Sequence, residues 1–231
     1  TYNLKSPIEI YGLSVTPSIS YADDFATDTV SGANGRYQLS IGTGSLSYDV
    51  DKMKLSVSNS YAFWRLKSYR FGRGSLSVKL HAGVYSDEGW TTSDNTGTMA
   101  IFSPDPRMAV NETYPGFAVS IRSIGGVFYT NIRHAGEYKL TDVELVGVSA
   151  GDELTIDGEY DQEHGVFYAY IYKSSTSKPV TPTLKYFTSI SETYYFGGFL
   201  NTDLPNAYTY VTDISIRAES IVGRTNVEVT E

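Results

Sequence analysis

Three carboxylates spaced two residues apart are the first catalytic candidates in this 231-residue sequence. Glu159, Asp161 and Glu163 lie in an alternating segment, and a period of two places all three side chains on one face of a strand. A pair of carboxyl groups facing one another is what glycoside hydrolysis uses. The segment also runs into a polar turn, 161–165, that ends in glycine. We therefore interpret the three acids as a solvated hairpin tip and keep hydrolysis as the alternative.

A second group of candidates follows from strands whose apolar sides are clear. The sets Leu76/Val78/Leu80 and Phe117/Val119/Ile121, with Phe128 and Ile132, are expected to face the core. The opposite sides then present Lys79, His81, Arg122, Tyr129, Asn131 and Arg133. We expect these side chains to share one sheet surface, where arginine would bind carboxylate or sulfate and tyrosine would stack on sugar rings. The alternative is ordinary solvated residues paired with acids.

Aromatic residues in the loop after the strand 75–85 form a third group. Trp90 and Tyr85 lie in or beside a segment rich in Thr, Ser, Asn and Gly. Aromatic side chains on exposed loops indicate binding, so the pair is a candidate platform for stacking a sugar. Trp90 folded back over the edge of the core is the alternative. Trp64 lies on the apolar side of its strand and is predicted to be in the core.

The elements that must position these residues are strands. Residues 151–172 read as two alternating arms around a turn, which predicts a β-hairpin rich in aromatic and β-branched residues. Helical spacing is absent over any stretch of ten residues. About twelve to fourteen strands with turns every 8–12 residues predict an all-β fold, an antiparallel β-sandwich of two packed sheets.

Composition narrows the classes of function. The net charge of −8 disfavours nucleic acid as a partner, because phosphate binding needs a basic surface. The absence of cysteine excludes disulfides, thiolate metal sites and cysteine nucleophiles. No apolar run reaches the roughly 20 residues that span a bilayer, so no membrane insertion is expected. The sequence begins at Thr1 without methionine, which is compatible with a removed signal peptide.

Three segments in order resemble the concanavalin A-like lectin/glucanase superfamily, which includes laminin-G-like modules. They are the strand 71–79, the hairpin 152–172 and the closing pair 195–199 and 210–216. The resemblance implies a jelly roll of two curved antiparallel sheets. It gives a domain at 23–218, an N-terminal segment 1–22 that packs on the sandwich, and a C-terminal strand or linker at 219–231. Such folds host both binding proteins and enzymes.

The resemblance also implies specific roles. In laminarinase-type glucanases a Glu-x-Asp-x-Glu strand supplies the nucleophile, an assisting aspartate and the acid/base, matching Glu159, Asp161 and Glu163. Here, however, polar Tyr160 and Gln162 stand where the family has aliphatic residues, and the motif comes late in the chain. The superfamily often holds a structural Ca²⁺ between the N-terminal segment and the last strand. Asp24 and Asp213 occupy the matching places.

From these observations we expect a non-catalytic extracellular module, on a cell or virion surface, that binds carbohydrate, including anionic glycans, or another surface ligand. One alternative is a polysaccharide-degrading enzyme of the same fold. It would be the glucanase above, or a lyase using Arg122 or Arg133 to neutralise a uronate with His81 or Tyr129 as base. Another is a structural capsid, filament or surface-layer protein. Homo-oligomerisation and membership of a larger multidomain chain stay open.

Overall fold

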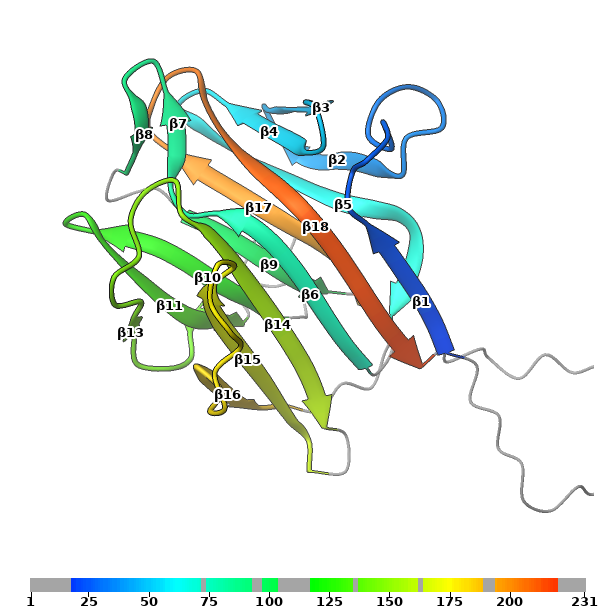
Figure 1. The fold of residues 1–231 in the computed structure, drawn as a ribbon, viewed down its shortest axis with the longest axis vertical. Helices are drawn as coiled ribbons and strands as arrows, with labels where there is room; N and C mark the ends of the chain where they lie inside the picture. The colour runs from blue at the N-terminus through cyan, green and yellow to red at the C-terminus, as the bar shows by residue number, and fades with distance from the viewer. Residues whose placement is uncertain are drawn as a thin grey trace, which may run out of the picture.

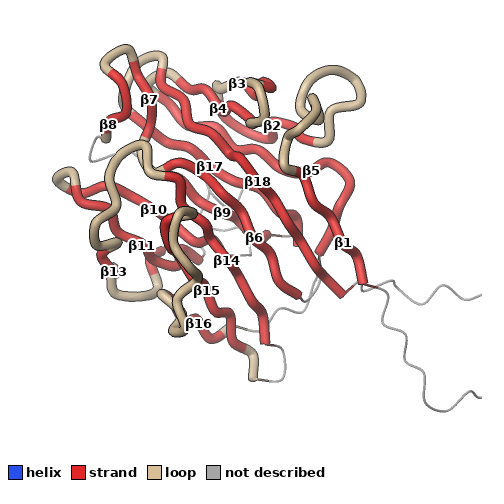
Figure 2. Tube along the Cα trace, viewed as in Figure 1, coloured by secondary structure: helices blue, strands red, loops and turns tan. Residues whose placement is uncertain are grey.

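The chain folds as two antiparallel sheets packed face to face. The computed structural model describes residues 18–71, 74–92, 97–103, 117–134, 137–161, 164–188 and 194–219. Every regular element in these ranges is a strand (Figure 2). Consequently none of them contains a helix that could cross a membrane. The predicted all-β sandwich is confirmed.

The first sheet contains ten strands among the described residues, and its spine runs β16-β15-β14-β6-β18-β4-β3. β1 pairs with β18, and β7 pairs with both β18 and β8. The strands are β1 (Ser18–Asp23), β3 (Ser45–Tyr48), β4 (Met53–Val57), β6 (Gly74–His81), β7 (Val84–Ser86), β8 (Gly89–Thr91), β14 (Glu153–Asp161), β15 (Val166–Lys173), β16 (Leu184–Phe187) and β18 (Ala207–Glu219). Figure 1 shows β14, β6, β18 and β1 side by side in the nearer layer.

The second sheet contains eight described strands in the order β12-β11-β10-β9-β17-β5-β2, with β13 beside β11. They are β2 (Tyr37–Gly42), β5 (Ser60–Phe71), β9 (Gly97–Ser103), β10 (Phe117–Ile124), β11 (Val127–His134), β12 (Glu137–Tyr138), β13 (Val143–Glu144) and β17 (Tyr194–Thr202). In Figure 1 they form the layer behind the ten-stranded sheet. Several connections therefore cross from one sheet to the other, as from β5 to β6 and from β17 to β18.

The core lies between the sheets and is built from alternate residues of both. β6, β14 and β18 contribute Val78, Ile156 and Ile214, while β5, β10 and β17 contribute Trp64, Ile121 and Phe196, all at most 3% exposed. Each such side chain contributes about 1.5–3 kcal/mol through burial. Trp64 lies in the core as predicted, and its indole leaves no room for a side chain at Gly198, where a Cβ would come within 2.6 Å of Nε1.

The two ends of the described chain meet at one place in the ten-stranded sheet. β1 pairs with the last residues of β18, from Ser18 opposite Glu219 to Asp23 opposite Ile214. Part of the predicted N-terminal segment is therefore a strand of the sandwich. Residues 1–17 and 220–231, which make up the rest of the two predicted terminal segments, lie outside the described residues.

Candidate ligand-binding site

The residues predicted to form one cationic surface lie on two different sheets. Lys79 and His81 belong to β6 in the ten-stranded sheet, whereas Arg122 belongs to β10 in the eight-stranded sheet. Tyr129, Asn131 and Arg133 follow on β11, beside β10. The prediction of one shared surface is therefore wrong. Alternation assigned the outward positions correctly, but it carries no information about which sheet a strand joins.

The cations on the eight-stranded sheet hold a neighbouring loop. Arg122 forms an ion pair with Asp142, and its guanidinium carbon lies 4.2 Å from the centre of the Tyr138 ring. Asn131 is only 2% exposed, donates to Asp142 Oδ1 at 2.8 Å and to the Leu140 carbonyl at 2.5 Å, and accepts from the Leu140 N–H at 3.0 Å. These two predicted ligand-binding residues are therefore engaged within the protein.

The lyase hypothesis loses one of its combinations for the same reason. His81 on the ten-stranded sheet cannot act as base for a uronate held by Arg122 or Arg133 on the other sheet, because the core separates them. Tyr129 does lie directly opposite Arg122 in the β10–β11 register. The partner of that arginine, however, is Asp142.

Five aromatic rings gather at one end of the outer face of the ten-stranded sheet. This aromatic cluster consists of His81, Tyr85, Trp90, Tyr208 and Tyr210. The His81 and Trp90 rings stack with centres 4.9 Å apart, and Tyr85 stacks on Tyr208 at 5.1 Å. Tyr210 meets both His81 and Tyr208 edge-on. The structure thus brings together three of the predicted binding residues, His81, Tyr85 and Trp90.

Trp90 is packed within this cluster and does not stand free of it. A Cβ added at Gly151, whose φ is +88°, would lie 2.7 Å from Trp90 Cγ, so the backbone there abuts the indole. His81 covers the same ring system by stacking. Burial lowers the pKa of His81, and Lys52 lowers it further, although Glu153 and a hydrogen bond with Tyr210 oppose the shift. The histidine therefore favours its neutral form.

Beside the cluster lies a groove of about 450 Å³, here called the Tyr208 groove. It is lined by Thr43, Gly44, Ser45, Lys54, Ser56, Val57, Ser58, Asn206 and Tyr208. The register explains its shape, because Ser45 lies opposite Ser56 and Ser56 lies opposite Tyr208. Two short side chains thus form a floor next to a tall aromatic wall. Lys54 completes the wall with its ammonium 3.7 Å from the centre of the Tyr208 ring.

Turns at the end of the sheet supply the remaining polar groups of the groove. Thr43 follows β2 and donates its hydroxyl to Ser60 at 2.6 Å. The Asn206 N–H donates to the Ser58 hydroxyl at 3.2 Å, and Asn206 has a φ of +49°, a conformation that asparagine tolerates in turns. Hydroxyls, an amide, an ammonium and an aromatic ring therefore converge on one hollow.

Sequence reasoning missed Tyr208, Tyr210 and Lys54. The alternation in Tyr208-x-Tyr210 shows that both tyrosines share one face of a strand. It cannot show that β18 pairs with β7, which sets Tyr208 opposite Tyr85, or with β4, which sets Tyr210 opposite Lys54.

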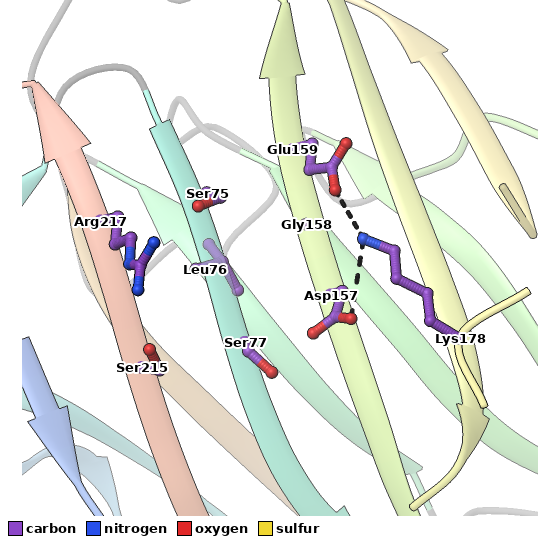
Figure 3. Close-up of a pocket in the computed structure, with 9 residues that line it drawn as sticks. All are labelled: Ser75, Leu76, Ser77, Asp157, Gly158, Glu159, Lys178, Ser215 and Arg217. Carbon is purple, nitrogen blue, oxygen red and sulfur yellow. Dashed lines mark hydrogen bonds and ion pairs between the residues drawn. The ribbon is translucent and has the colours of Figure 1, made fainter. Parts of the chain in front are cut away.

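The acids of the Glu-x-Asp-x-Glu motif do not form one cluster among the described residues. Glu159 lines a hollow of about 240 Å³ at the other end of the same outer face, where Lys178 binds both Glu159 at 2.5 Å and Asp157 at 3.7 Å (Figure 3). We call this hollow the Arg217 trough. Asp161 ends β14 and binds His164 in the turn at 2.8 Å. Glu163 lies outside the described residues.

The motif differs from the hairpin-tip interpretation in one more respect. Tyr160 packs against the hydrophobic core, and its hydroxyl donates to the Thr188 carbonyl at 3.2 Å. The residue between the first two acids is therefore turned inward, as an aliphatic residue would be. Only Asp161 fits the predicted solvated tip, while Glu159 stands within the sheet.

The two predicted calcium ligands have other partners. Asp213 accepts from the Lys79 ammonium at 3.2 Å, and Asp24 is exposed and accepts from the Ala26 N–H at 3.1 Å. Across the described ranges no three His, Cys, Asp or Glu side chains come together as metal ligands would. The lysine supplies the positive charge that a cation would bring to Asp213. These residues give no support to a calcium site, which stays a prediction.

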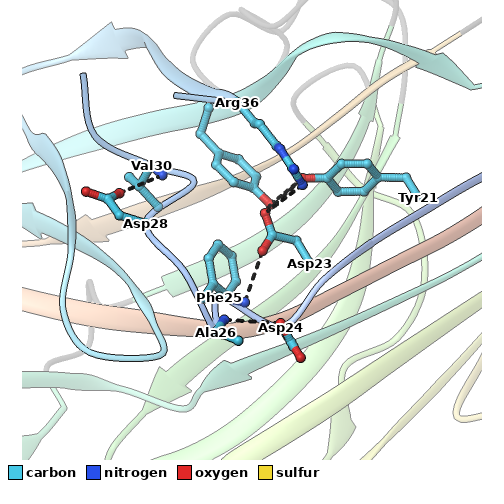
Figure 4. A network of polar contacts seen from close by, with 9 residues as sticks. Tyr21, Asp23, Asp24, Phe25, Ala26, Asp28, Val30 and Arg36 are labelled. Atoms are coloured by element: carbon cyan, nitrogen blue, oxygen red, sulfur yellow. Dashed lines mark hydrogen bonds and ion pairs between the residues drawn. The ribbon is translucent and has the colours of Figure 1, made fainter. Parts of the chain in front are cut away.

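The neighbouring Asp23 is the buried acid of this region, at 6% exposed (Figure 4). Its Oδ2 accepts from the hydroxyls of Tyr21 at 3.0 Å and Tyr37 at 2.9 Å, and its Oδ1 accepts from the Phe25 N–H. Arg36 lies 3.8 Å from the same carboxylate. Burial raises the pKa of Tyr21 to about 12. Protein donors therefore satisfy Asp23, which fixes the loop after β1.

Comparison with known proteins supports the fold and little beyond it. No protein-family model and no curated protein sequence matches the chain. Its structure is similar to the lectin from Bauhinia forficata in complex with GalNAc, with a TM-score of 0.61 and 12% identity over 87% of this chain and 98% of that one. Arcelin-5, a lectin-like defense protein from Phaseolus vulgaris, gives 0.62 and 11% over 87% and 97%.

The winged bean acidic lectin complexed with methyl-α-D-galactose gives a TM-score of 0.62 at 10% identity, over 87% of this chain and 98% of that one. Sequence identities this low show a shared fold, and they do not allow the binding residues of these lectins to be assigned to positions in this chain. The chain therefore has the concanavalin A-like fold of the legume lectins, as the sequence resemblance implied.

Proposed function

We propose that this chain is a non-catalytic module that binds carbohydrate in the Tyr208 groove. The observation that carries the proposal is the lining of the groove, where hydroxyls and an amide surround a floor beside an aromatic ring. A sugar presents C–H groups that pack on aromatic rings and hydroxyls that need both donors and acceptors. The lectin-like fold supports the same class of ligand, since two of the similar lectins were solved with sugars.

The charge in the groove favours an acidic sugar. Among the described residues that line the groove, Lys54 is the one charged side chain, so this lining presents a positive charge and no carboxylate. A carboxylate or sulfate substituent would pair with this ammonium in a charge-assisted hydrogen bond. The sequence predicts that the arginines of β10 and β11 bind the acidic group of a glycan. We assign that role instead to Lys54 of β4. A location outside the cell or on a virion or cell surface would bring the module to such glycans.

A glycan array carrying neutral and acidic saccharides tests this proposal. The wild-type chain should bind a subset of glycans, and Tyr208→Ala should weaken binding about tenfold or more through loss of the ring. Tyr129→Ala is the matched control, because Tyr129 lies in β11 of the eight-stranded sheet, on the other side of the sandwich from the groove, and should bind as wild type. No hits, together with concentration-dependent assembly, would instead favour a structural role.

The catalytic alternative has its own test. Incubation with β-glucans should release no reducing ends if the chain only binds. Release that is abolished by Glu159→Gln would contradict the non-catalytic assignment and return Glu159 to the role that the sequence resemblance implied.

A further inference from the structure

We propose that the Arg217 trough is a second binding site, which takes a carboxylate- or sulfate-bearing sugar unit. The trough lies on the outer face of β18, β6 and β14 and shares no residue with the Tyr208 groove (Figure 3). Its floor is made by Ser75, Ser77 and Ser215, whose short side chains leave the hollow between taller walls. Its volume of about 240 Å³ suits one small unit, since pockets for drug-sized ligands start at about 300 Å³.

Arg217 on one wall of the trough forms no ion pair with Glu159 or Asp157 on the other wall. Arg217 lies opposite Ser75, and Ser75 lies opposite Glu159, so one strand separates the guanidinium from the acid. Neighbouring strands are about 4.8 Å apart, which places β18 and β14 roughly 10 Å from each other. A ligand that spans the floor could contact both walls.

The acidic wall already has its own cation. Lys178 binds Glu159 and Asp157, and Tyr172 donates its hydroxyl to Asp157 at 2.8 Å. Partial burial lowers the pKa of Lys178, but the hydrogen bond that its ammonium donates to Glu159 and the charges of the nearby acids raise the pKa by more, so the net shift is upward and the ammonium stays charged. These carboxylates can therefore still accept hydrogen bonds from the hydroxyls of a ligand, while Lys178 largely balances their charge.

Arg217 on the other wall has no such partner. It is exposed, and in the described part of the chain no carboxylate pairs with it. Its guanidinium offers a planar set of N–H donors that matches a carboxylate or sulfate, with the serine hydroxyls beside it. The chemistry that fits is an oxyanion at Arg217 and sugar hydroxyls toward Asp157 and Glu159.

β18 contributes to both the trough and the groove, and the nine residues from Tyr208 to Arg217 in this strand span roughly 30 Å. An acidic polysaccharide lying along this strand could therefore occupy both hollows at once. The trough is nevertheless inferred from its own residues, so its failure would leave the groove untouched.

Calorimetric titration with a uronate trisaccharide tests the inference, with the carboxyl-reduced trisaccharide as the neutral probe. Titrations are made in the wild-type chain and in Tyr208→Ala, which removes the groove. In the Tyr208→Ala background the acidic trisaccharide should still bind, and adding Arg217→Ala should weaken that binding about tenfold or more. Arg217→Lys should recover part of it. Lys67→Ala removes the same charge from the other sheet and should change nothing.

Amide chemical shifts separate the outcomes. The acidic trisaccharide should move the resonances of Ser75, Ser77 and Ser215, and Arg217→Ala should abolish those shifts. If Tyr208→Ala removes all binding and these amides never move, the trough is not a site, while the proposed function stands. If binding persists unchanged in every variant, both assignments are wrong.

Discussion

Arg122 on the outer face of the eight-stranded sheet is engaged differently from two cations on the outer face of the ten-stranded sheet, Lys54 and Arg217. On the eight-stranded sheet, Arg122 meets a carboxylate and a tyrosine ring from the segment that follows β11, and Asn131 is buried under the same segment. On the ten-stranded sheet Lys79 also pairs with a carboxylate, whereas Lys54 and Arg217 border hollows with serine floors and form no ion pair with any carboxylate that the structure describes. A cation that faces outward from a strand is therefore evidence for ligand binding only when it is known that no loop of the protein covers it.

The largest expected effect comes from the covered face. Asn131→Ala should lower the free energy of unfolding by about 2–3 kcal/mol, because it leaves the polar groups of Leu140 and Asp142 without their buried partner. Urea denaturation measures the change. Thr141→Ala, at an exposed position of the same loop, should stay within about 0.5 kcal/mol of wild type. Asn131→Ala should bind glycans as wild type does. A loss of glycan binding without unfolding would contradict the assignment of a structural role to this face and of binding to the ten-stranded sheet.

A smaller effect should come from the packing of Trp90. Gly151→Ala should cost about 1–3 kcal/mol, since it adds a methyl group against the indole at a residue with positive φ. Gly147→Ala is the matched control, because its φ is also positive but nothing lies within 4 Å of the added atom. Gly147→Ala should lower the free energy of unfolding by up to about 1 kcal/mol, which is the cost of placing a residue other than glycine at positive φ. Thermal unfolding followed by tryptophan fluorescence compares the stability of the two variants. Equal losses of stability would mean that the contact between Gly151 and Trp90 does not contribute.

The two arginines themselves should differ in stability. Arg122→Ala should cost about 1 kcal/mol, because a partly exposed ion pair and a ring contact are lost. Arg217→Ala should stay within about 0.5 kcal/mol, as expected for an exposed residue that pairs with no carboxylate in the described part of the chain. Chemical denaturation of both variants tests this directly. A larger loss for Arg217→Ala would show that the trough arginine has a structural role.

The smallest expected effect is a pH dependence from His81. Its pKa is lowered in the folded chain, chiefly by burial, so below about pH 6.5 the unfolded chain takes up a proton that folded His81 refuses. Stability should therefore be full at neutral pH and fall as the pH drops below that value. His81→Gln should remove this part of the slope between about pH 7.5 and pH 5.5. The pKa of His134 is lowered in the same direction, so His134→Gln should also remove part of the slope, and an unchanged slope in His81→Gln would contradict the burial argument.

The sequence predicts the strands better than it predicts their neighbours. Alternation placed Val78 and Val119 inward and Lys79 outward, because burial of one face fixes the orientation of a strand. Pairing depends on partners distant in sequence. β6 lies between β14 and β18, about 75 and 130 residues away, and no local pattern encodes that neighbourhood.

The candidate site was predicted only in part for the same reason. Tyr85 and Trp90 come from one stretch of chain, and local reasoning placed them together, whereas it assigned His81 to the cationic surface and the structure stacks it on Trp90. Tyr208 and Lys54 join them through pairing between β18, β7 and β4. Conversely, Asn131 was assigned to ligand binding because its strand position faces outward, and nothing local shows that residues 140–142 fold back over it.

Chemical-shift mapping of the isotopically labelled chain tests the central claim most directly. Glucuronate is the acidic probe, and methyl-α-D-galactoside and N-acetylgalactosamine are the neutral ones. The account predicts that a probe which binds moves the amide resonances of Ser45, Ser56, Ser58 and Asn206 most, and that Tyr208→Ala removes those shifts. If all three probes leave these amides unmoved, or if the shifts centre on Arg122 and Tyr129, the Tyr208 groove is not the binding site.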